Sequence, residues 1–277
     1  MQFPFAKKSL GQNFLNSPKA LADIIESAKV GVGDEVLEIG PGRGVLTKEL
    51  LKAGAHVTAV EKDRELVKVL GEMFAEEIEK GQIEIVEGDV LEFDIQGYVK
   101  GLGGGKSYKL IANIPYYITG QIFRMFLEGS DDGQRCREDP REGPLTSQPS
   151  SMTLLVQKEV AERVVARDGK ESILSLSVKA YGEPKYVSTV KRGSFTPSPN
   201  VDSAILHIAN ISKNFFTDNG ISEKKFFEIV KAGFAHKRKI LFGNLKEKGF
   251  VLPETIDQKI RAEDLKIGDW VGIVKGN

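Results

Sequence analysis

The chain has almost no cysteine: Cys136 is the single one among 277 residues, so an internal disulfide cannot form. This scarcity favours a reducing compartment. No apolar run approaches the ~18 residues of a membrane span. The first eight residues contain no apolar stretch long enough for a signal peptide. We therefore expect a cytoplasmic protein without a membrane partner.

Metal ligands are also scarce. Cys136 stands alone in a polar stretch, and the histidines, His56, His207 and His236, are not spaced as metal ligands are. We therefore expect no metal ion in the chemistry of this protein. The length exceeds that of a usual single domain, which predicts one large domain and one small one.

Net charge is zero, with 39 basic and 39 acidic residues, but the two kinds are unevenly distributed. Residues 184–250 hold twelve Lys and Arg against five Asp and Glu, and residues 1–20 hold three lysines and no acid. This asymmetry supplies the positive potential that contacts with phosphate groups need. The run Lys237, Arg238 and Lys239 is a candidate for such contacts. The alternative is an ordinary solvated helix face.

The order of strand and helix patterns defines the expected domains. Strands and helices alternate to about Phe126, which predicts an α/β fold with a mostly parallel, doubly wound sheet. Residues 1–20 form a basic arm, and the sheet domain is expected over residues 21–210. Within it, residues 129–151 are polar and aperiodic, which predicts a flexible insertion. The helical pattern that follows predicts a small all-helical domain over residues 211–277.

A glycine-rich turn follows the first expected strand, which covers Glu35–Ile39. The turn contains Gly40, Gly42 and Gly44, and a helix is expected from Val45. Glycine lets the backbone adopt positive φ and approach a ligand closely. NAD enzymes show a similar pattern, but the form here is G-x-G-x-G, without the later glycine of the dinucleotide fingerprint.

Carboxylates stand at the ends of the next two expected strands. Glu61 lies 21 residues after Gly40, an offset that suits a carboxylate holding two ribose hydroxyls. Asp89 follows the third strand and can accept a hydrogen bond from an adenine amino group. Lys62 and Val90, the residues directly after these carboxylates, belong to the same expected cofactor pocket. Either carboxylate alone is equally typical of a helix cap or a turn.

The fourth expected strand runs into Asn113-Ile114-Pro115-Tyr116. The exocyclic amine of a nucleobase is a poor nucleophile because its lone pair is delocalised into the ring. The Asn113 side-chain oxygen and the Ile114 or Pro115 carbonyl can grip its N–H groups and localise that lone pair. Tyr116 can stack on the base, a contact worth roughly 1–3 kcal/mol. A strand-ending turn would also contain Asn and Pro. Together with the upstream pocket, however, the motif predicts an S-adenosylmethionine site beside an amine substrate.

In this order, six segments resemble the KsgA/RsmA-type rRNA adenine N6,N6-dimethyltransferases, from about Lys8 to the C-terminus. They are Lys8–Leu15, the glycine turn with Glu61 and Asp89, Asn113–Tyr116, Gln157–Arg163, Phe195–Ser203 and the region from His236 to Leu245. The resemblance implies a Rossmann-like class I S-adenosylmethionine-dependent methyltransferase with a small C-terminal all-helical domain.

The resemblance also implies roles for particular residues. The cofactor S-adenosyl-L-methionine is expected to contact Asn13 and Leu15 as well as Asn113. The residues expected at the reaction itself are Asn113, Pro115, Tyr116 and Phe195, with Phe195 packed near the target base.

By resemblance, the reaction is the dimethylation of two adjacent adenines in the 3′-terminal hairpin of 16S rRNA. The partner is then the small ribosomal subunit as a 30S precursor, which Lys237, Arg238 and Lys239 contact. The protein is expected to act as a monomer.

Three alternatives stay open. The first is a resistance-type adenine methyltransferase of 23S rRNA, against which Tyr117, Val201-Asp202-Ser203 and the basic helical tail argue. The second is a non-catalytic ribosome-assembly or transcription factor on the same fold, which would have lost residues such as Glu61 or Asn113. The third is a DNA adenine methyltransferase, for which the chain offers no target-recognition domain of adequate size.

Overall fold

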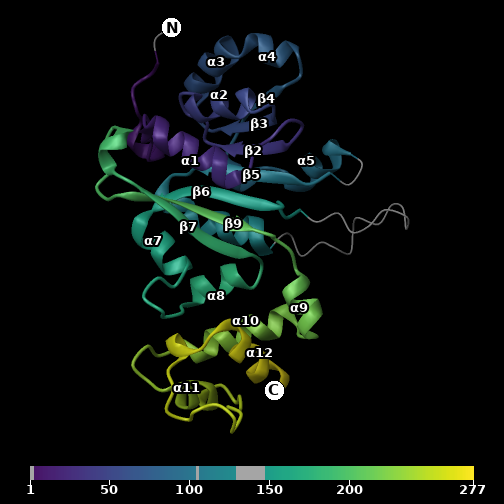
Figure 1. The fold of residues 1–277 in the computed structure, drawn as a ribbon, viewed down its shortest axis with the longest axis vertical. Helices are drawn as coiled ribbons and strands as arrows, with labels where there is room; N and C mark the ends of the chain where they lie inside the picture. The colour runs from purple at the N-terminus through teal and green to yellow at the C-terminus, as the bar shows by residue number, and fades with distance from the viewer. Residues whose placement is uncertain (1–2, 104–105, 129–146) are drawn as a thin grey trace. The chain divides into compact units, whose positions relative to one another are not determined.

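The computed structural model describes residues 3–103, 106–128 and 147–277. These residues form a main sheet of seven strands in the order β4-β3-β2-β5-β6-β9-β7 (Figure 1). The strands are β2 (Glu35–Ile39), β3 (His56–Glu61), β4 (Ile83–Glu87), β5 (Tyr108–Asn113), β6 (Ser151–Gln157), β7 (Glu183–Val190) and β9 (Ser203–Ala209). Strands β4, β3, β2, β5 and β6 are mutually parallel, and β9 runs antiparallel to β6.

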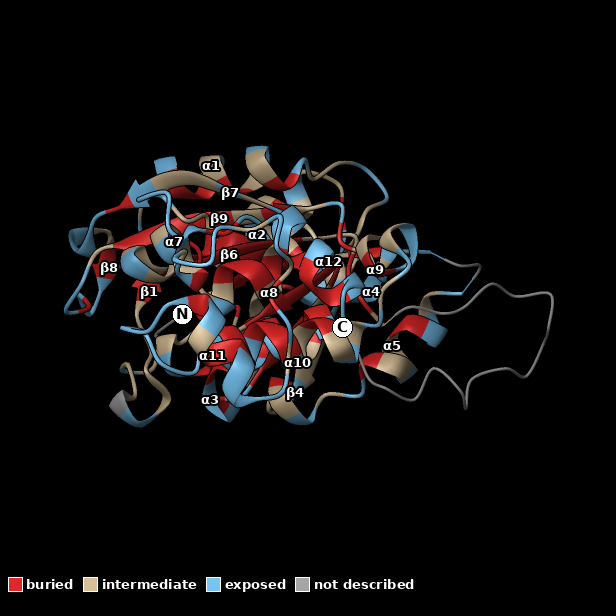
Figure 2. Cartoon of the chain, turned by 90° about the horizontal axis from the view of Figure 1, so that it is seen from below, coloured by how far each residue is buried: buried red, intermediate tan, exposed pale blue. Residues whose placement is uncertain are grey.

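The parallel strands carry nearly continuous apolar runs because helices and neighbouring strands exclude water from them. Residues 36–39 of β2 and 110–112 of β5 are at most 3% exposed. Figure 2 shows such buried residues in red along the strands of the sheet. Since parallel strands end at the same edge, the residues that follow β2, β3, β4 and β5 meet there. This is where the sequence predicts the cofactor pocket.

The helices of the described residues alternate with these strands in the first half of the chain. They are α1 (Pro18–Ala28), α2 (Val45–Lys52), α3 (Arg64–Met73), α4 (Ala75–Glu79), α5 (Ile95–Leu102), α6 (Thr119–Phe123), α7 (Lys158–Val164), α8 (Ile173–Lys179), α9 (Asn214–Asn219), α10 (Glu223–Gly233), α11 (Leu241–Glu247) and α12 (Ile267–Lys275). Helices α1, α2 and α3 pack on one face of the sheet, where Ile24, Leu50 and Leu70 join Val36 and Ile111 in one hydrophobic core.

A second sheet of two short strands lies outside the main one. Strand β1 (Phe14–Leu15) pairs antiparallel with β8 (Phe195–Thr196), so that Leu15 stands opposite Phe195. Both side chains are 4% exposed and belong to the same core as α1 and β6. The N-terminal arm is thereby tied to a loop 180 residues later in the chain, between β7 and β9.

The predicted insertion over residues 129–151 needs a correction at its C-terminal end. Residues 129–146 lie outside the described residues, but residues 147–151 are part of the fold. The Tyr108 hydroxyl donates to the Ser147 carbonyl at 2.8 Å, and the Ser150 N–H donates to the Tyr108 carbonyl at 2.8 Å. Gln148 is buried and donates to the Leu127 carbonyl. These bonds lead the chain directly into β6.

Contacts divide the chain into two compact units. The sheet unit comprises residues 1–158 and 185–211, and the helical unit comprises residues 159–184 and 212–277. The predicted boundary between the domains, after residue 210, lies next to the junction after residue 211. The predicted domains differ from these units over residues 159–184, which group with the C-terminal helices because Tyr181 packs on Phe216 and Phe227, with ring centroids 5.5 and 5.9 Å away.

The helical unit has its own core of buried side chains from α10, α11 and α12. Phe226, Leu241 and Trp270 are all fully buried there. Asn244 is 1% exposed, and its side-chain amide donates to the Gly233 carbonyl at 2.6 Å and to the His236 carbonyl at 3.2 Å. This side chain therefore fixes the turn that joins α10 to α11.

Glu38 is a buried acidic residue in the interior of the sheet. It lies on β2, is 1% exposed, and its Oε2 has no hydrogen-bond partner among the described residues. Burial raises the pKa of this carboxyl to about 8; the adjacent Thr47 opposes the shift, and the charge of Glu61 adds to it. Glu38 is therefore mostly protonated at neutral pH.

Glu38→Gln should reduce the pH dependence of stability. In the unfolded chain Glu38 has its ordinary pKa of 4.5. Between that value and about 8 the folded state therefore holds a proton that the unfolded state has lost, and its stability falls as pH rises. The variant has no such group, so this loss does not occur in it. The free energy of unfolding of the variant minus that of the wild type should therefore increase by about 1.4 kcal/mol for each unit by which pH rises in this window. Urea unfolding at pH 5, 6, 7 and 8 measures the difference. If stability changes with pH equally in the wild type and the variant, Glu38 does not have the raised pKa.

Candidate active site

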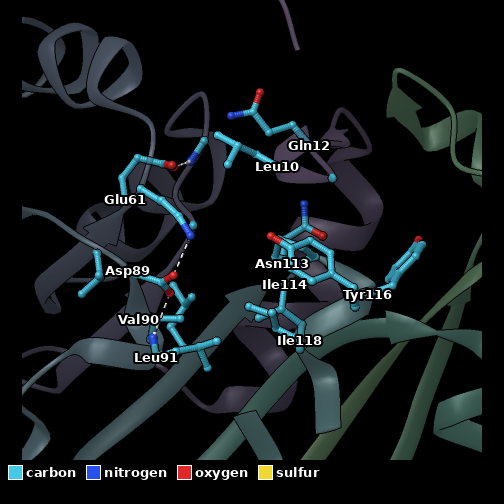
Figure 3. Close-up of a pocket in the computed structure, with 18 of the residues that line it drawn as sticks. Leu10, Gln12, Glu61, Asp89, Val90, Leu91, Asn113, Ile114, Tyr116 and Ile118 are labelled. Atoms are coloured by element: carbon cyan, nitrogen blue, oxygen red, sulfur yellow. Dashed lines mark hydrogen bonds and ion pairs between the residues drawn. The ribbon is translucent and has the colours of Figure 1, made fainter. Parts of the chain in front are cut away.

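A pocket of about 290 Å³ lies at the carboxyl ends of β2, β3, β4 and β5 (Figure 3). Its walls come from the segment 10–14, from these four strand ends and from the segment 113–121. Such a site between strand ends is where parallel α/β sheets bind ligands. All of the residues that line the pocket belong to the sheet unit.

The glycine turn forms one wall. Gly40 and Gly42 have φ of +65° and +59°, which residues with a side chain rarely adopt. A Cβ at Gly42 would lie 3.1 Å from the Phe14 ring, so a side chain here would also be tight against Phe14. At Gly40 a Cβ would come no closer than 3.8 Å, to the Asn113 carbonyl. The turn therefore presents bare backbone to the pocket.

Glu61 ends β3 and binds two backbone N–H groups. Its Oε2 accepts from Gly42 at 3.0 Å and its Oε1 accepts from Asp63 at 2.9 Å. Burial raises the pKa of Glu61, and the two N–H donors oppose this shift. Each oxygen retains a lone pair, so the carboxylate can still accept from a ligand while it holds the glycine turn in place.

Asp89 follows β4, the strand next to β3, and lies on the same side of the pocket as Glu61 (Figure 3). Its Oδ1 accepts from the Leu91 N–H at 3.0 Å, and its Oδ2 forms an ion pair with Lys62 Nζ at 2.6 Å (Figure 3). The Lys62 ammonium lowers the pKa of Asp89, so the carboxylate is ionised at neutral pH. The predicted residues Lys62 and Asp89 therefore bind each other, and Val90 forms an apolar wall beside them.

The Asn113 amide has a fixed orientation. Its Nδ2 donates to the Asn13 carbonyl at 3.0 Å, and the Asn13 side chain in turn donates to the Gly11 carbonyl at 3.0 Å. No described residue donates to Asn113 Oδ1. The Ile114 carbonyl is equally unpaired among the described residues, whereas the Pro115 carbonyl already accepts from Ile118 N–H at 3.2 Å. Asn113 Oδ1 and the Ile114 carbonyl are thus the two acceptors that no described residue already occupies, whereas the Pro115 carbonyl has one lone pair left.

Tyr116 follows on a short 3-10 helix and is partly buried. Its hydroxyl shares a hydrogen bond with the buried Ser203 hydroxyl, the two oxygens being 2.6 Å apart. Burial raises the pKa of Tyr116 and Ser203 opposes the shift, so the phenol stays neutral at physiological pH. Ser203 therefore fixes where the ring lies in the pocket.

The N-terminal arm closes one side of the pocket, and a buried aspartate holds it. Asp63 accepts from Lys7 Nζ at 2.6 Å and from Gln12 Nε2 at 2.9 Å. Burial disfavours the ionised form of Asp63, but the hydrogen bonds from Lys7 and Gln12 outweigh it and keep the pKa below its usual value. The Arg43 guanidinium stacks on Phe14 at 4.5 Å from the ring centroid and adds a second attachment.

Ten of the predicted site residues line this one pocket: Asn13, Gly40, Gly42, Glu61, Lys62, Asp89, Val90, Asn113, Pro115 and Tyr116. Leu15 and Phe195 do not line it, because they face each other across the β1–β8 pair and are buried in the core. The sequence reasoning assigned no role to Leu10, Gln12 or Ser203, although all three lie within the recognised segments Lys8–Leu15 and Phe195–Ser203.

The predicted RNA-contacting run lies in the helical unit. Lys237, Arg238 and Lys239 are exposed, but they occupy the turn between α10 and α11 rather than a helix, because Asn244 holds that turn open. Lys239 forms an ion pair with Glu247. Lys237 and Arg238 have no ion-pair partner among the described residues, so their charges are available to a ligand.

Two negative findings apply to the described ranges. Within residues 3–103, 106–128 and 147–277, no group of three His, Cys, Asp or Glu side chains could hold a metal ion. In the same ranges no helix is long and apolar enough to cross a membrane.

Comparison with known sequences gives consistent results. The protein family described as ribosomal RNA adenine dimethylase matches residues 5–276. A ribosomal RNA small subunit methyltransferase A of Dehalococcoides mccartyi is 38% identical over 276 residues, which cover 96% of this chain and 86% of the relative. The protein of the same name from Fusobacterium nucleatum is 38% identical over 283 residues, covering 97% and 96% of the two chains.

Solved structures share the fold. The 23S rRNA methyltransferase ErmE superposes with a TM-score of 0.71 at 24% identity and covers 95% of this chain and 98% of its own. A dimethyladenosine transferase from Plasmodium falciparum superposes with a TM-score of 0.70 at 23% identity, covering 94% and 95%. The predicted Rossmann-like methyltransferase fold with a helical C-terminal part is thereby confirmed.

Asp63→Ser should release the N-terminal arm. Serine still caps α3 through its hydroxyl, but it removes the charge that holds Lys7 and Gln12. Because hydrogen bonds to charged groups contribute about 1.5–3 kcal/mol, the variant should lose stability of that order. Limited trypsin digestion should also cleave the arm faster.

The matched control is Glu65→Ala. Glu65 also lies near Lys7, at 3.2 Å, but its side chain is 63% exposed, so its loss should change little. Equal digestion rates for the wild type and Asp63→Ser would show that Asp63 does not hold the arm.

Proposed function

The chain belongs to the ribosomal RNA adenine dimethylase family, and on this premise we propose how its pocket performs the reaction. It is an enzyme that methylates adenine in small-subunit ribosomal RNA. The observation that carries the mechanism is the orientation of Asn113: its amide N–H is bound to the Asn13 carbonyl at 3.0 Å, so its oxygen is left for a substrate.

The residues of the pocket fit S-adenosylmethionine as the methyl donor. The bare glycine turn allows a ligand to approach the backbone, and Glu61 has lone pairs left for ribose hydroxyls. Asp89 offers a carboxylate to an adenine amino group, with the apolar side chains of Val60 and Val90 beside it. When bound, this group supplies an electrophilic methyl on a sulfonium, which is already an excellent leaving group.

Asn113 and Ile114 act on the substrate amine. Asn113 Oδ1 and the Ile114 carbonyl accept the two N–H groups of the adenine amine, which draws the nitrogen towards tetrahedral geometry and localises its lone pair. Preorganised acceptors of this kind require no rearrangement at the moment of reaction. The amine becomes acidic as it is alkylated, so water or a weak acceptor removes its proton, and we assign no strong general base.

Tyr116 holds the base. Its ring presents a face to a flipped or unpaired adenine, in the way that base-modifying enzymes reach their target atom. The hydrogen bond to Ser203 prevents the ring from rotating out of this position. Alignment of base and methyl donor is then the main contribution of the chain to the rate.

The proposed substrate is a pair of adjacent adenines in the 3′-terminal hairpin of 16S rRNA, in a precursor of the 30S subunit. The relatives at 38% identity are named small-subunit methyltransferases. ErmE, whose name gives 23S rRNA, is 24% identical, and this likeness supports the fold alone. A non-catalytic factor is disfavoured because the acceptors of the site are intact. Action as a monomer in the cytoplasm, without a metal, stays a prediction.

The test is mass spectrometry of 16S rRNA from unmethylated 30S particles after incubation with the protein and S-adenosylmethionine. We expect N6,N6-dimethyladenosine at two adjacent positions. Unmethylated 50S particles serve as the matched control. Methyl groups on 23S rRNA alone would instead identify the resistance-type enzyme.

Asn113→Ala should strongly reduce methylation, because it removes the acceptor that localises the lone pair. The loss of one such preorganised group typically lowers kcat by about 10²–10³. Calorimetry should show S-adenosylmethionine affinity within a few-fold of the wild type. Single-turnover kinetics on 30S particles measure the step itself, and retained turnover would refute the role of the amide.

Replacing Lys237 and Arg238 with Ala should weaken binding to 30S particles and flatten its salt dependence. The slope of log K against log salt should fall by up to about one unit for each phosphate group that is no longer bound. Adding Lys239→Ala should have a smaller effect, since Glu247 already neutralises this side chain. The matched control replaces two other exposed lysines of the helical unit, Lys224 and Lys259. An equal effect in the control would mean that net charge alone matters.

A further inference from the structure

Tyr117 is the exposed aromatic residue at the mouth of the pocket. Three aromatic rings line this pocket among the described residues. Phe14 is 5% exposed and Tyr116 is partly buried, whereas Tyr117 is 63% exposed. No described residue forms a hydrogen bond with its hydroxyl. Because so much of the ring is exposed to solvent, its burial contributes little to the stability of the fold. The mechanism above does not use it.

One side of the ring nevertheless lies against the N-terminal arm. A Cβ at Gly11 would lie 3.1 Å from Tyr117 Cε1 and 3.4 Å from Cδ1, so one side of the ring lies close to the backbone of the N-terminal arm. Gly11 has φ of +62°, which favours glycine at this position. The short helix that carries Tyr117 is fixed at both ends. Ile118 N–H donates to the Pro115 carbonyl at 3.2 Å, and the Thr119 hydroxyl donates to the Tyr116 carbonyl at 3.0 Å.

A ring on a hydrogen-bonded turn, with one side against the protein and the remainder in water, can serve as a stacking platform for a ligand. Aromatic side chains of this kind bind successive bases of single-stranded nucleic acid, because each base offers a π-face. Tyr117 is adjacent in sequence to Tyr116, and a nucleotide next to the one in the pocket must leave through the same mouth.

We infer that Tyr117 stacks on the nucleobase next to the adenine that is being methylated. The inference rests on the proposed function and adds a second base to the substrate that the site recognises. In the proposed substrate this neighbour is itself an adenine, whose two fused rings give a large stacking surface. Tyr116 then holds the reacting base inside the pocket, while Tyr117 holds its neighbour at the rim.

The test compares Tyr117→Ala, Tyr117→Leu and Tyr117→Phe on unmethylated 30S particles. Stacking that is equal in the ground state and the transition state raises affinity for both, so its removal raises KM and leaves kcat unchanged. Tyr117→Ala should therefore raise KM by about 5- to 150-fold, which corresponds to the range for one stacked base. Tyr117→Phe should retain the wild-type KM, since the hydroxyl forms no hydrogen bond with any described residue. Tyr117→Leu should behave like Tyr117→Ala, because bulk without a π-face does not stack.

Two controls distinguish stacking on a base from a purely structural role of Tyr117. Calorimetry with S-adenosylmethionine and thermal unfolding should give wild-type values for all three variants, and a loss in either would make Tyr117 a structural support of the arm. Val32→Ala removes another exposed side chain, 91% exposed and at the amino end of β2, and should change nothing. A wild-type KM for Tyr117→Ala or Tyr117→Leu would overturn this inference and leave the proposed function intact. Inactive wild-type protein would instead overturn the proposed function.

Discussion

The buried carboxylate of Glu61 is the interaction on which the rest of the site depends. One oxygen binds the N–H of Gly42 and the other binds the N–H of Asp63, so the glycine turn and the start of α3 are fixed to one side chain. Asp63 in turn binds Lys7 and Gln12 of the N-terminal arm. A single strand-end residue thereby sets the position of two pocket walls that are well separated in the chain. Removing it would disturb the arm as well as the cofactor wall.

The charges around the pocket are arranged so that negative groups are partly neutralised before a ligand binds. Glu38 does not line the pocket, but its charge interacts with that of Glu61. Burial raises the pKa of Glu38 to about 8 and keeps it protonated, so Glu61 has no second full negative charge near it. Asp89 is ionised but paired with Lys62 at 2.6 Å. The pocket is left mildly negative, which favours the proposed cofactor with its positive sulfonium. Full ionisation of all these carboxyls would favour the cation more strongly, but their mutual repulsion would destabilise the fold.

The sequence predicts the parts of this site that follow from local patterns. Glu61 and Asn113 can be recognised because the apolar runs before them mark buried strands, and parallel strands end at one edge. The positions of Leu15 and Phe195 cannot be found in this way, since a two-residue strand pair that joins segments 180 residues apart leaves no periodic signal. The same holds for the Tyr116–Ser203 hydrogen bond. The pattern around the basic run predicts a helical region, but nothing local indicates that a buried side chain holds the run in a turn.

The two side chains proposed to act on the substrate, Asn113 and Tyr116, are held in different ways, and the difference fits their tasks. Asn113 must point one oxygen at an amine, and its orientation is set by a backbone carbonyl, that of Asn13. A backbone carbonyl does not titrate, and a side-chain substitution at position 13 does not remove it. Tyr116 needs only to present a face, and one hydroxyl, that of Ser203, suffices to hold it. The orientation of the amide therefore does not depend on the side chain at position 13, provided that the arm stays in place. Because the arm is held through Asp63, the reactivity of the amine and the closure of the pocket are coupled by the same contacts.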